Sequence, residues 1–143
     1  MTLKQLIKLE DNANEVWVIS PSLHYDVENK EFTELVSVNL NQKTKYRYIV
    51  PATSEIDKHI DTYKKLYQLS DADVRDNFLI LAESDFNPFI LEIGIYNGSA
   101  DCIACAAPAT EDSDDVIQFN EKTSKTMAKH FKLLWKKYKQ FDL

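Results

Sequence analysis

Gly98 and Ser99 stand between two apolar stretches, and a glycine-serine pair of this kind can bind phosphate. A glycine lets backbone N–H groups approach an anion closely, and the serine hydroxyl adds a further donor. The same place also has a structural explanation, because Asn97-Gly98 between apolar runs is the strongest short signal for a β-hairpin, where the glycine supplies a positive φ. The sequence favours the hairpin, and Asn97 and Ser99 remain candidate ligand-binding residues.

Three histidines have the side chain that a nucleophile or a general base requires. His24 comes directly after a predicted strand, whereas His59 and His130 fall on predicted helices. A single histidine on a helix is more often a surface or packing residue than a catalytic one. His24 is therefore the best functional candidate of the three.

Cys102 and Cys105 form a Cys-x-x-Cys motif within a predicted strand. Residues three apart on a strand point to opposite faces of the sheet, so these thiols are expected neither to pair nor to share a metal ion. No second pair of cysteines completes a zinc site. The acids of residues 111–115 lack the glycine and the spacing of a calcium loop, and we expect a solvated turn there. The sequence predicts no metal site and no cofactor.

Helices and strands alternate along the first part of the chain. The expected elements are a helix capped by Thr2, a strand at Glu15–Ser20, a helix over residues 30–42, a strand at Lys45–Pro51, a helix opened by a capping box at Ser54–Asp57, a helical turn or loop at Ser70–Asp76, strands at Asn77–Glu83 and Phe89–Tyr96, a further strand in SADCIACAAP, and a long last helix with the apolar stripe Met127, Phe131, Leu134, Trp135 and Tyr138.

This order predicts an α/β fold. Alternating strands and helices call for parallel strands, and the hairpin at Asn97-Gly98 makes the last two strands antiparallel. We expect a mixed β-sheet of about five strands, parallel in its first part and ending in an antiparallel hairpin, flanked by helices. A chain of 143 residues fits one domain, spanning residues 1–143.

Composition and charge narrow the classes of function. Hydrophobic residues make up 44% and charged residues 28%, as in an ordinary globular protein, and the net charge of -6 argues against a general nucleic-acid binder. The first residues lack the apolar run of a signal peptide or a membrane helix, so a cytoplasmic location without membrane insertion is expected. Seven of the 17 basic side chains and two of the 23 acidic ones fall in residues 120–143. We expect this basic tail to form a solvated helix face that complements the acidic body.

A ligand site is expected beyond the carboxyl ends of the parallel strands, which is where open α/β sheets bind ligands. Hydroxyl groups and backbone N–H groups at a helix start suit a small anionic or phosphorylated ligand. The alternative is that the serines and the threonine only cap turns and helices. The candidate ligand-binding residues in these loops are Ser20, Ser22, His24, Tyr25, Asp26, Thr53 and Ser54.

Three stretches resemble one half of a phospholipase D-like protein. EVWVISPSLHYD resembles the opening strand of that fold, KEFTELVSVNLNQKTKYRYIVP resembles its helix and second strand, and KHFKLLWKKY resembles its closing helix. The resemblance covers most of residues 10–140. It implies a phospholipase D-like fold whose cleft is built from two such halves, and therefore a homodimer or a complex with a partner protein.

The catalytic motif of that family is missing here. The resemblance implies His-x-Lys on the fourth strand, but NPFILEIGIYNGSADCIACAA holds neither histidine nor lysine. Ile90 and Glu92 stand near those positions in one register, and Ser84 and Phe86 in the other. We therefore expect no catalytic residue, and a non-catalytic binding or regulatory domain that senses a small anionic ligand or mediates protein interaction. The alternative is a phosphodiesterase or nuclease with a relocated catalytic histidine such as His24.

Overall fold

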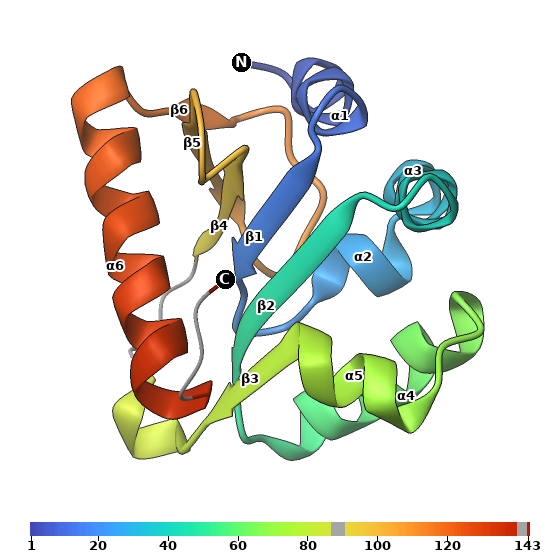
Figure 1. Ribbon diagram of the computed structural model, residues 1–143. Helices are drawn as coiled ribbons and strands as arrows, with labels where there is room; N and C mark the ends of the chain where they lie inside the picture. Colours follow the sequence, from blue (N-terminus) through green and yellow to red (C-terminus); the bar gives the residue numbers. More distant parts are fainter. Residues whose placement is uncertain (87–90, 140–142) are drawn as a thin grey trace.

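The computed structural model describes residues 1–86, 91–139 and 143, and it is an α/β fold built on a mixed open sheet (Figure 1). The sheet has the strand order β3-β2-β1-β4-β5-β6. β1, β2 and β3 are parallel, whereas β4, β5 and β6 each run antiparallel to the preceding neighbour in the sheet. The strands are β1 (Glu15–Ile19), β2 (Lys45–Pro51), β3 (Phe78–Leu81), β4 (Leu91–Tyr96), β5 (Ile103–Pro108) and β6 (Ile117–Gln118).

The expected architecture is confirmed, with one strand more than the number expected. The described residues contain six strands rather than about five, because the two-residue strand β6 adds to the edge of β5. So short a strand has too few residues to show an alternating pattern in the sequence. The expected strand at Phe89–Tyr96 is present from Leu91, and its first two residues lie outside the described part of the chain.

Helices cover both faces of the sheet. α6 (Glu121–Lys139) lies on one face, and the helices α1 to α4 lie on the other (Figure 1). The remaining bounds are α1 (Leu3–Asp11), α2 (His24–Glu28), α3 (Lys30–Asn41), α4 (Ser54–Leu66), α5 (Asp71–Asn77) and the short 3-10 turn η1 (Glu83–Asp85). No helix in the described ranges is both long enough and apolar enough to cross a bilayer.

Two helix starts differ from expectation. The cap of α4 is Thr53, whose side chain accepts a hydrogen bond from the backbone N–H of Ile56, so the expected capping box at Ser54 is wrong by one residue. The helix α2 begins at His24, within the segment SPSLHYD, where a loop was expected. Leu23 precedes α2 with φ 60°, a left-handed conformation that an apolar residue rarely signals in a sequence.

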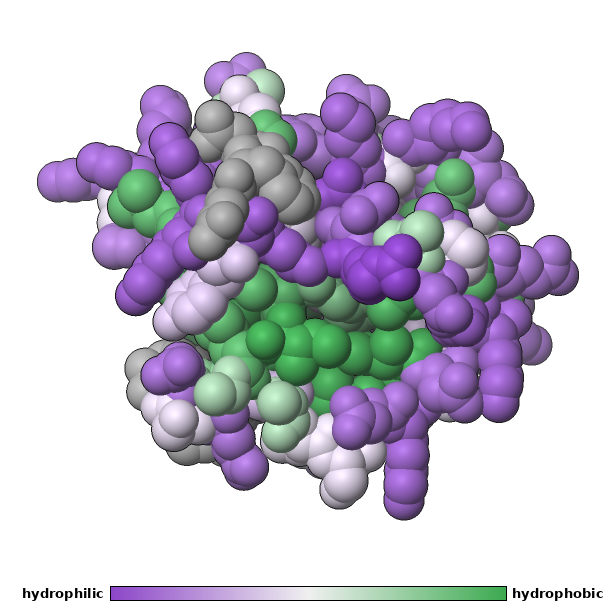
Figure 2. Space-filling view, turned by 60° about the horizontal axis from the view of Figure 1, so that its bottom comes forward, coloured by the Kyte–Doolittle hydropathy of each residue, from purple (hydrophilic) through white to green (hydrophobic). Residues whose placement is uncertain are grey.

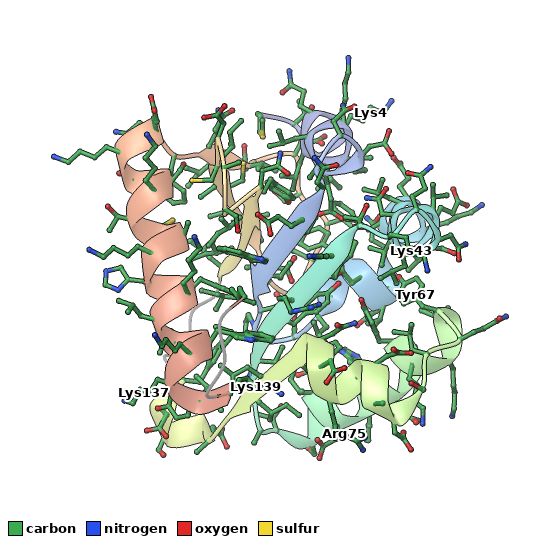
Figure 3. All side chains as sticks on the ribbon, in the orientation of Figure 1. Lys4, Lys43, Tyr67, Arg75, Lys137 and Lys139 are labelled. Carbon is green, nitrogen blue, oxygen red and sulfur yellow. The ribbon has the colours of Figure 1, made fainter. Side chains whose placement is uncertain are left out.

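The last helix packs on its own sheet through aromatic rings. Phe131 stacks between Trp17 of β1 and Trp135, with ring centroids 5.1 and 5.9 Å apart. The end of α6 is tied to α5, because Lys139 Nζ donates to the backbone oxygen of Arg75 at 2.5 Å (Figure 3). Tyr138 is 40% exposed, so its expected place in the apolar stripe is wrong.

The hairpin at Asn97-Gly98 is confirmed, but the reason for its glycine is not the expected one. β4 and β5 pair antiparallel from Tyr96 and Ile103, so the connection is longer than a two-residue turn. Asn97 takes the positive φ, at 56°, and Gly98 does not have a positive φ. A Cβ atom at Gly98 would lie 2.2 Å from Cζ3 of Trp17. Gly98 is therefore required by the close approach of an indole ring.

Cys102 and Cys105 are free thiols buried in different cores, as expected, although Cys102 precedes β5 and does not lie within the strand. Cys102 packs on the α6 side of the sheet, and Cys105 packs on the opposite side. Burial raises the pKa of Cys105 to about 11, so its reactive thiolate is scarce at neutral pH.

We expect a thiol reagent to label both cysteines of the native protein slowly, on the order of a hundredfold more slowly than in denaturant, since labelling requires opening of the core. The measurement is a time course with a chromogenic disulfide reagent, with and without urea. Fast native labelling of both thiols, or a disulfide formed in mild oxidant, would contradict their separate burial.

Candidate functional site

The hydroxyl groups of the serines after β1 form hydrogen bonds within the protein. Ser20 Oγ accepts hydrogen bonds from the backbone N–H groups of Ser22 and Leu23, at 3.3 and 2.8 Å. Ser22 Oγ donates to the backbone oxygen of Ala109. Both serines are buried. These hydroxyl groups hold the turn between β1 and α2, which is the structural alternative that the sequence left open.

His24 belongs to a cluster of paired side chains. Its Nε2 lies 2.9 Å from Oδ1 of Asp112, and its Nδ1 lies 3.9 Å from the carboxylate of Glu28. The same carboxylate lies 3.3 Å from Nε2 of His59 in α4. The cluster therefore joins α2, α4 and the acidic loop, and both ring nitrogens of His24 lie near a carboxylate.

The acidic loop of residues 111–115 docks on the rest of the protein. Asp112 also accepts a hydrogen bond from Asn29 Nδ2, at 2.9 Å, and the hydrogen bonds from Asn29 and His24 hold the pKa of Asp112 below its usual range. Tyr25 Oη donates to the backbone oxygen of Glu111 at 2.8 Å. The four acids of the loop are exposed, as expected of a solvated turn, and the hydrogen bonds also anchor the loop to α2.

Asn97 and Ser99 lie at the opposite end of the strands from the loops that follow β1 and β2. β4 runs antiparallel to β1, so the hairpin meets the start of β1. Asn97 Oδ1 accepts from the backbone N–H of Asn14 at 2.8 Å, and the backbone N–H of Ser99 donates to the carboxylate of Glu15 at 2.7 Å. The expected set of nine ligand-binding residues is therefore divided between two ends of the molecule.

Asp26 belongs to a buried network of tyrosines. Tyr48 Oη donates to its carboxylate at 2.5 Å, and Tyr63 Oη donates to Tyr48 Oη at 3.1 Å. Tyr67 Oη donates to the backbone oxygen of Asp26 at 2.5 Å. Burial raises the pKa of Asp26 to about 6, although the hydrogen bond from Tyr48 opposes this shift. Asp26 was expected to line a ligand site in solvent, but it faces the core.

A second buried carboxyl group belongs to Glu10 of α1. Tyr46 Oη donates to Glu10 Oε2 at 2.9 Å, and Asn39 Nδ2 donates to Tyr46 Oη at 3.1 Å. Burial, followed by the nearby Asp26, raises the pKa of Glu10 well above its usual range. The sequence carries a sign of this burial, because Glu10 continues the apolar stripe of Leu3, Leu6 and Ile7.

A third carboxyl group, that of Glu92, lines the same internal cavity as Glu10 and Asp26. Glu92 of β4 is partly buried, and burial, followed by the negative charge of the nearby Asp26, raises its pKa to about 8. Glu10, Asp26 and Glu92 all line a cavity of about 20 Å³ between the sheet and the helices α1 and α2, which is room for about one water molecule. No group of three or more possible metal ligands occurs in the described parts of the chain. The cavity is too small for a substrate.

The accessible space at the carboxyl ends of the parallel strands is apolar. A hollow of about 220 Å³ lies there, lined by Pro21 after β1, Pro51 and Thr53 at the end of β2, and Glu83 and Phe86 after β3. Figure 2 brings this end of the molecule forward and shows a hydrophobic depression there, but on the scale of that figure Phe86 is the one strongly hydrophobic residue among the described residues that line the hollow. The location agrees with the expected ligand edge, whereas Thr53 is the single expected residue that lines the hollow.

Comparison of the chain with protein-family models, with curated proteins and with solved structures gives no significant match. The hydrogen bonds and the lining of the site itself therefore indicate what it binds. At the end of the sheet where a ligand was expected, the hydroxyl groups of Ser20, Ser22, Tyr25 and Thr53 are hydrogen-bonded within the chain. The imidazoles of His24 and His59 are paired with carboxylates, and Ser54 is exposed at the start of α4. The open volume is lined mainly by carbon. This lining suits an apolar group better than an anion.

Proposed function

We propose that the protein is a non-catalytic binding module that takes one apolar side chain of a partner protein into the hollow of Pro21, Pro51, Thr53, Glu83 and Phe86. The observation that carries this proposal is the lining of the hollow at the carboxyl ends of β1, β2 and β3, which consists mainly of carbon atoms. We place the module in the cytoplasm and among the phospholipase D-like domains that serve as regulators. Support for that family is the order of elements, with three parallel strands, an antiparallel hairpin and a closing helix.

The size of the hollow favours a side chain over a free metabolite. Pockets for small molecules usually span roughly 300–1,000 Å³, and this hollow of about 220 Å³ lies below that range. Protein interfaces commonly place one aromatic or aliphatic anchor in a pocket of this kind. Glu83 on the rim adds negative charge, so a basic residue beside the anchor completes the preferred partner segment.

The proposal of a non-catalytic role has its own support. His24, the candidate for a relocated nucleophile, has its Nε2 2.9 Å from the carboxylate of Asp112, and the carboxylate of Glu28 lies 3.9 Å from its Nδ1, beyond hydrogen-bond distance. The charged groups beside this imidazole are thus carboxylates, whereas a phosphodiester requires cations or hydrogen-bond donors. In one of the two registers Glu92 of β4 stands near the position of the family's lysine, and a carboxyl group there lacks the positive charge that would hold a phosphodiester.

A small aromatic probe tests the hollow. We expect 3-methylindole to shift the backbone amide resonances of Thr53, Glu83 and Phe86 in a heteronuclear NMR titration, with a dissociation constant of about 1 mM, as is reasonable for so small a ligand. The variant Glu83→Trp places a large apolar side chain at the hollow and should abolish these shifts. Asp85→Trp is the matched control, since it changes the same 3-10 turn at a residue that does not line the hollow.

Three results would overturn the proposal. If inorganic phosphate shifts the amide resonances at the start of α4 and 3-methylindole does not, the site binds the small anionic ligand that the sequence predicted. Turnover of bis(p-nitrophenyl) phosphate that His24→Ala abolishes would favour the phosphodiesterase. Equal binding of 3-methylindole by Glu83→Trp would place the apolar site elsewhere.

A further inference from the structure

A groove with oppositely charged walls lies between α1 and α3. Its volume is about 480 Å³, and within the described part of the chain its lining comes from these two helices: Lys4, Ile7, Lys8, Asp11, Glu31, Glu34, Leu35 and Val38. The helices lie side by side (Figure 1). They run in the same direction, because Asn39 Nδ2 near the end of α3 donates to the backbone oxygen of Glu10 near the end of α1, at 3.3 Å.

The floor of the groove is apolar. Leu35 is buried, Ile7 is partly buried, and Val38 is 49% exposed. Burial of such a floor is favourable at about 25 cal/mol per Å² of apolar surface. An apolar floor is compatible with many partners, and the charged residues on the walls identify the one that fits.

Each wall carries one sign of charge over its first two turns. Lys4 and Lys8 stand on α1, and Glu31 and Glu34 stand on α3. All four residues are exposed. Figure 3 shows Lys4 extending from α1 away from the body of the protein. Among the ion pairs found between described residues, none joins the two walls. The four charges are thus presented to solvent.

We propose that a second copy of the chain covers this groove, with a two-fold axis running along it. This rotation places α1 of each copy over α3 of the other. Lys4 and Lys8 of one copy then face Glu31 and Glu34 of the other at the same level, because α1 and α3 run parallel. Ile7 meets Val38 at the same time. A two-fold interface uses one surface twice, and this surface is complementary to itself.

The charges favour a second copy over other occupants. A basic partner segment meets like charge on the wall of α1, and an acidic segment meets like charge on the wall of α3, which is unfavourable in either case. The two-fold arrangement avoids both conflicts. The interface is on the α1 and α3 side of the sheet, and the proposal is independent of the apolar hollow.

Charge reversal tests this dimer in the full chain. We expect analytical ultracentrifugation at low salt to show a dimer whose dissociation constant rises with ionic strength. The variant Lys4→Glu/Lys8→Glu should weaken it by about tenfold or more, since both contacts then join like charges, and Glu31→Lys/Glu34→Lys should do the same. An equimolar mixture of these two variants should recover the wild-type affinity, because every contact again joins opposite charges. Lys122→Glu/Lys129→Glu on α6 is the control and should leave the dimer unchanged.

Circular dichroism checks that the variants, all at exposed positions, remain folded. A strictly monomeric wild-type chain at low salt overturns the proposal. So does a dimer that keeps its affinity in both charge-reversal variants, or a mixture of the two variants that stays monomeric.

Discussion

Lowering the pH from about 8 to about 5 is expected to stabilise the fold by at least about 3 kcal/mol, against the usual loss of stability on acidification. Burial raises the pKa of Asp26 from 3.8 to about 6 and that of Glu92 from 4.5 to about 8. It also raises the pKa of Glu10. One pKa unit corresponds to about 1.4 kcal/mol, so between pH 8 and pH 5 Glu92 accounts for about 3 kcal/mol, and Asp26, whose folded pKa lies about one unit inside that range, for about 1 kcal/mol.

The direction follows from the protons bound in each state. A carboxyl group with a raised pKa keeps its proton in the fold when the unfolded chain has already lost it. The unfolded state then binds fewer protons, and the free energy of unfolding falls as the pH rises. This fall begins near the unfolded pKa of about 4 and ends near pH 8, the folded value for Glu92. The surface acids with lowered pKa values, such as Asp71, act in the opposite direction, but their exposure screens them.

Urea unfolding between about pH 5 and about pH 9 measures this effect. In the variant Glu92→Gln the slope between pH 6 and pH 8 should flatten, because the group that titrates there is gone. Glu121→Gln on the surface of α6 is the matched control and should keep the wild-type slope. A stability maximum near pH 8, or equal slopes in the wild type and Glu92→Gln, would show that these carboxyl groups are ionised in the fold.

The second large effect is expected for Gly98→Ala, which should destabilise the protein by about 3 kcal/mol and lower the melting temperature by about 10 °C. The added Cβ atom would lie 2.2 and 2.4 Å from Cζ3 and Cε3 of Trp17. That ring is 1% exposed and stacks on Phe131, so it has little space into which to move.

Thermal unfolding with two further variants tests the cause. Ser99→Ala, in the same loop, should change stability by less than about 0.5 kcal/mol. Ser99 is exposed, and it contacts Glu15 through its backbone N–H, which the substitution retains. The cost of Gly98→Ala should fall in a Trp17→Leu background, where the clash is absent. Additive effects of the two substitutions would place the strain elsewhere in the loop.

The local elements were predictable because they depend on neighbours in the sequence. The apolar spacing of α1, the β-branched and aromatic run of β2 and the capping residue Thr2 each act within a few residues. The opposite burial of Cys102 and Cys105 also follows from the two-residue period of a strand. The strand β6 was missed because its single partner is β5, and pairing across a loop leaves no local pattern.

The candidate site shows what only the tertiary structure decided. The sequence by itself determined an α/β fold, the parallel strands that end at one edge, and therefore the edge where a ligand is expected. It did not determine which side chains reach solvent at that edge, because Ser22, His24 and Asp26 find their partners in Ala109, Asp112 and Tyr48, which are distant along the chain. It likewise could not show that Gly98 serves Trp17 or that Glu92 meets two other carboxyl groups. Burial, and with it the pKa of an acid and the apolar lining of a hollow, depends on what the folded chain places beside each residue.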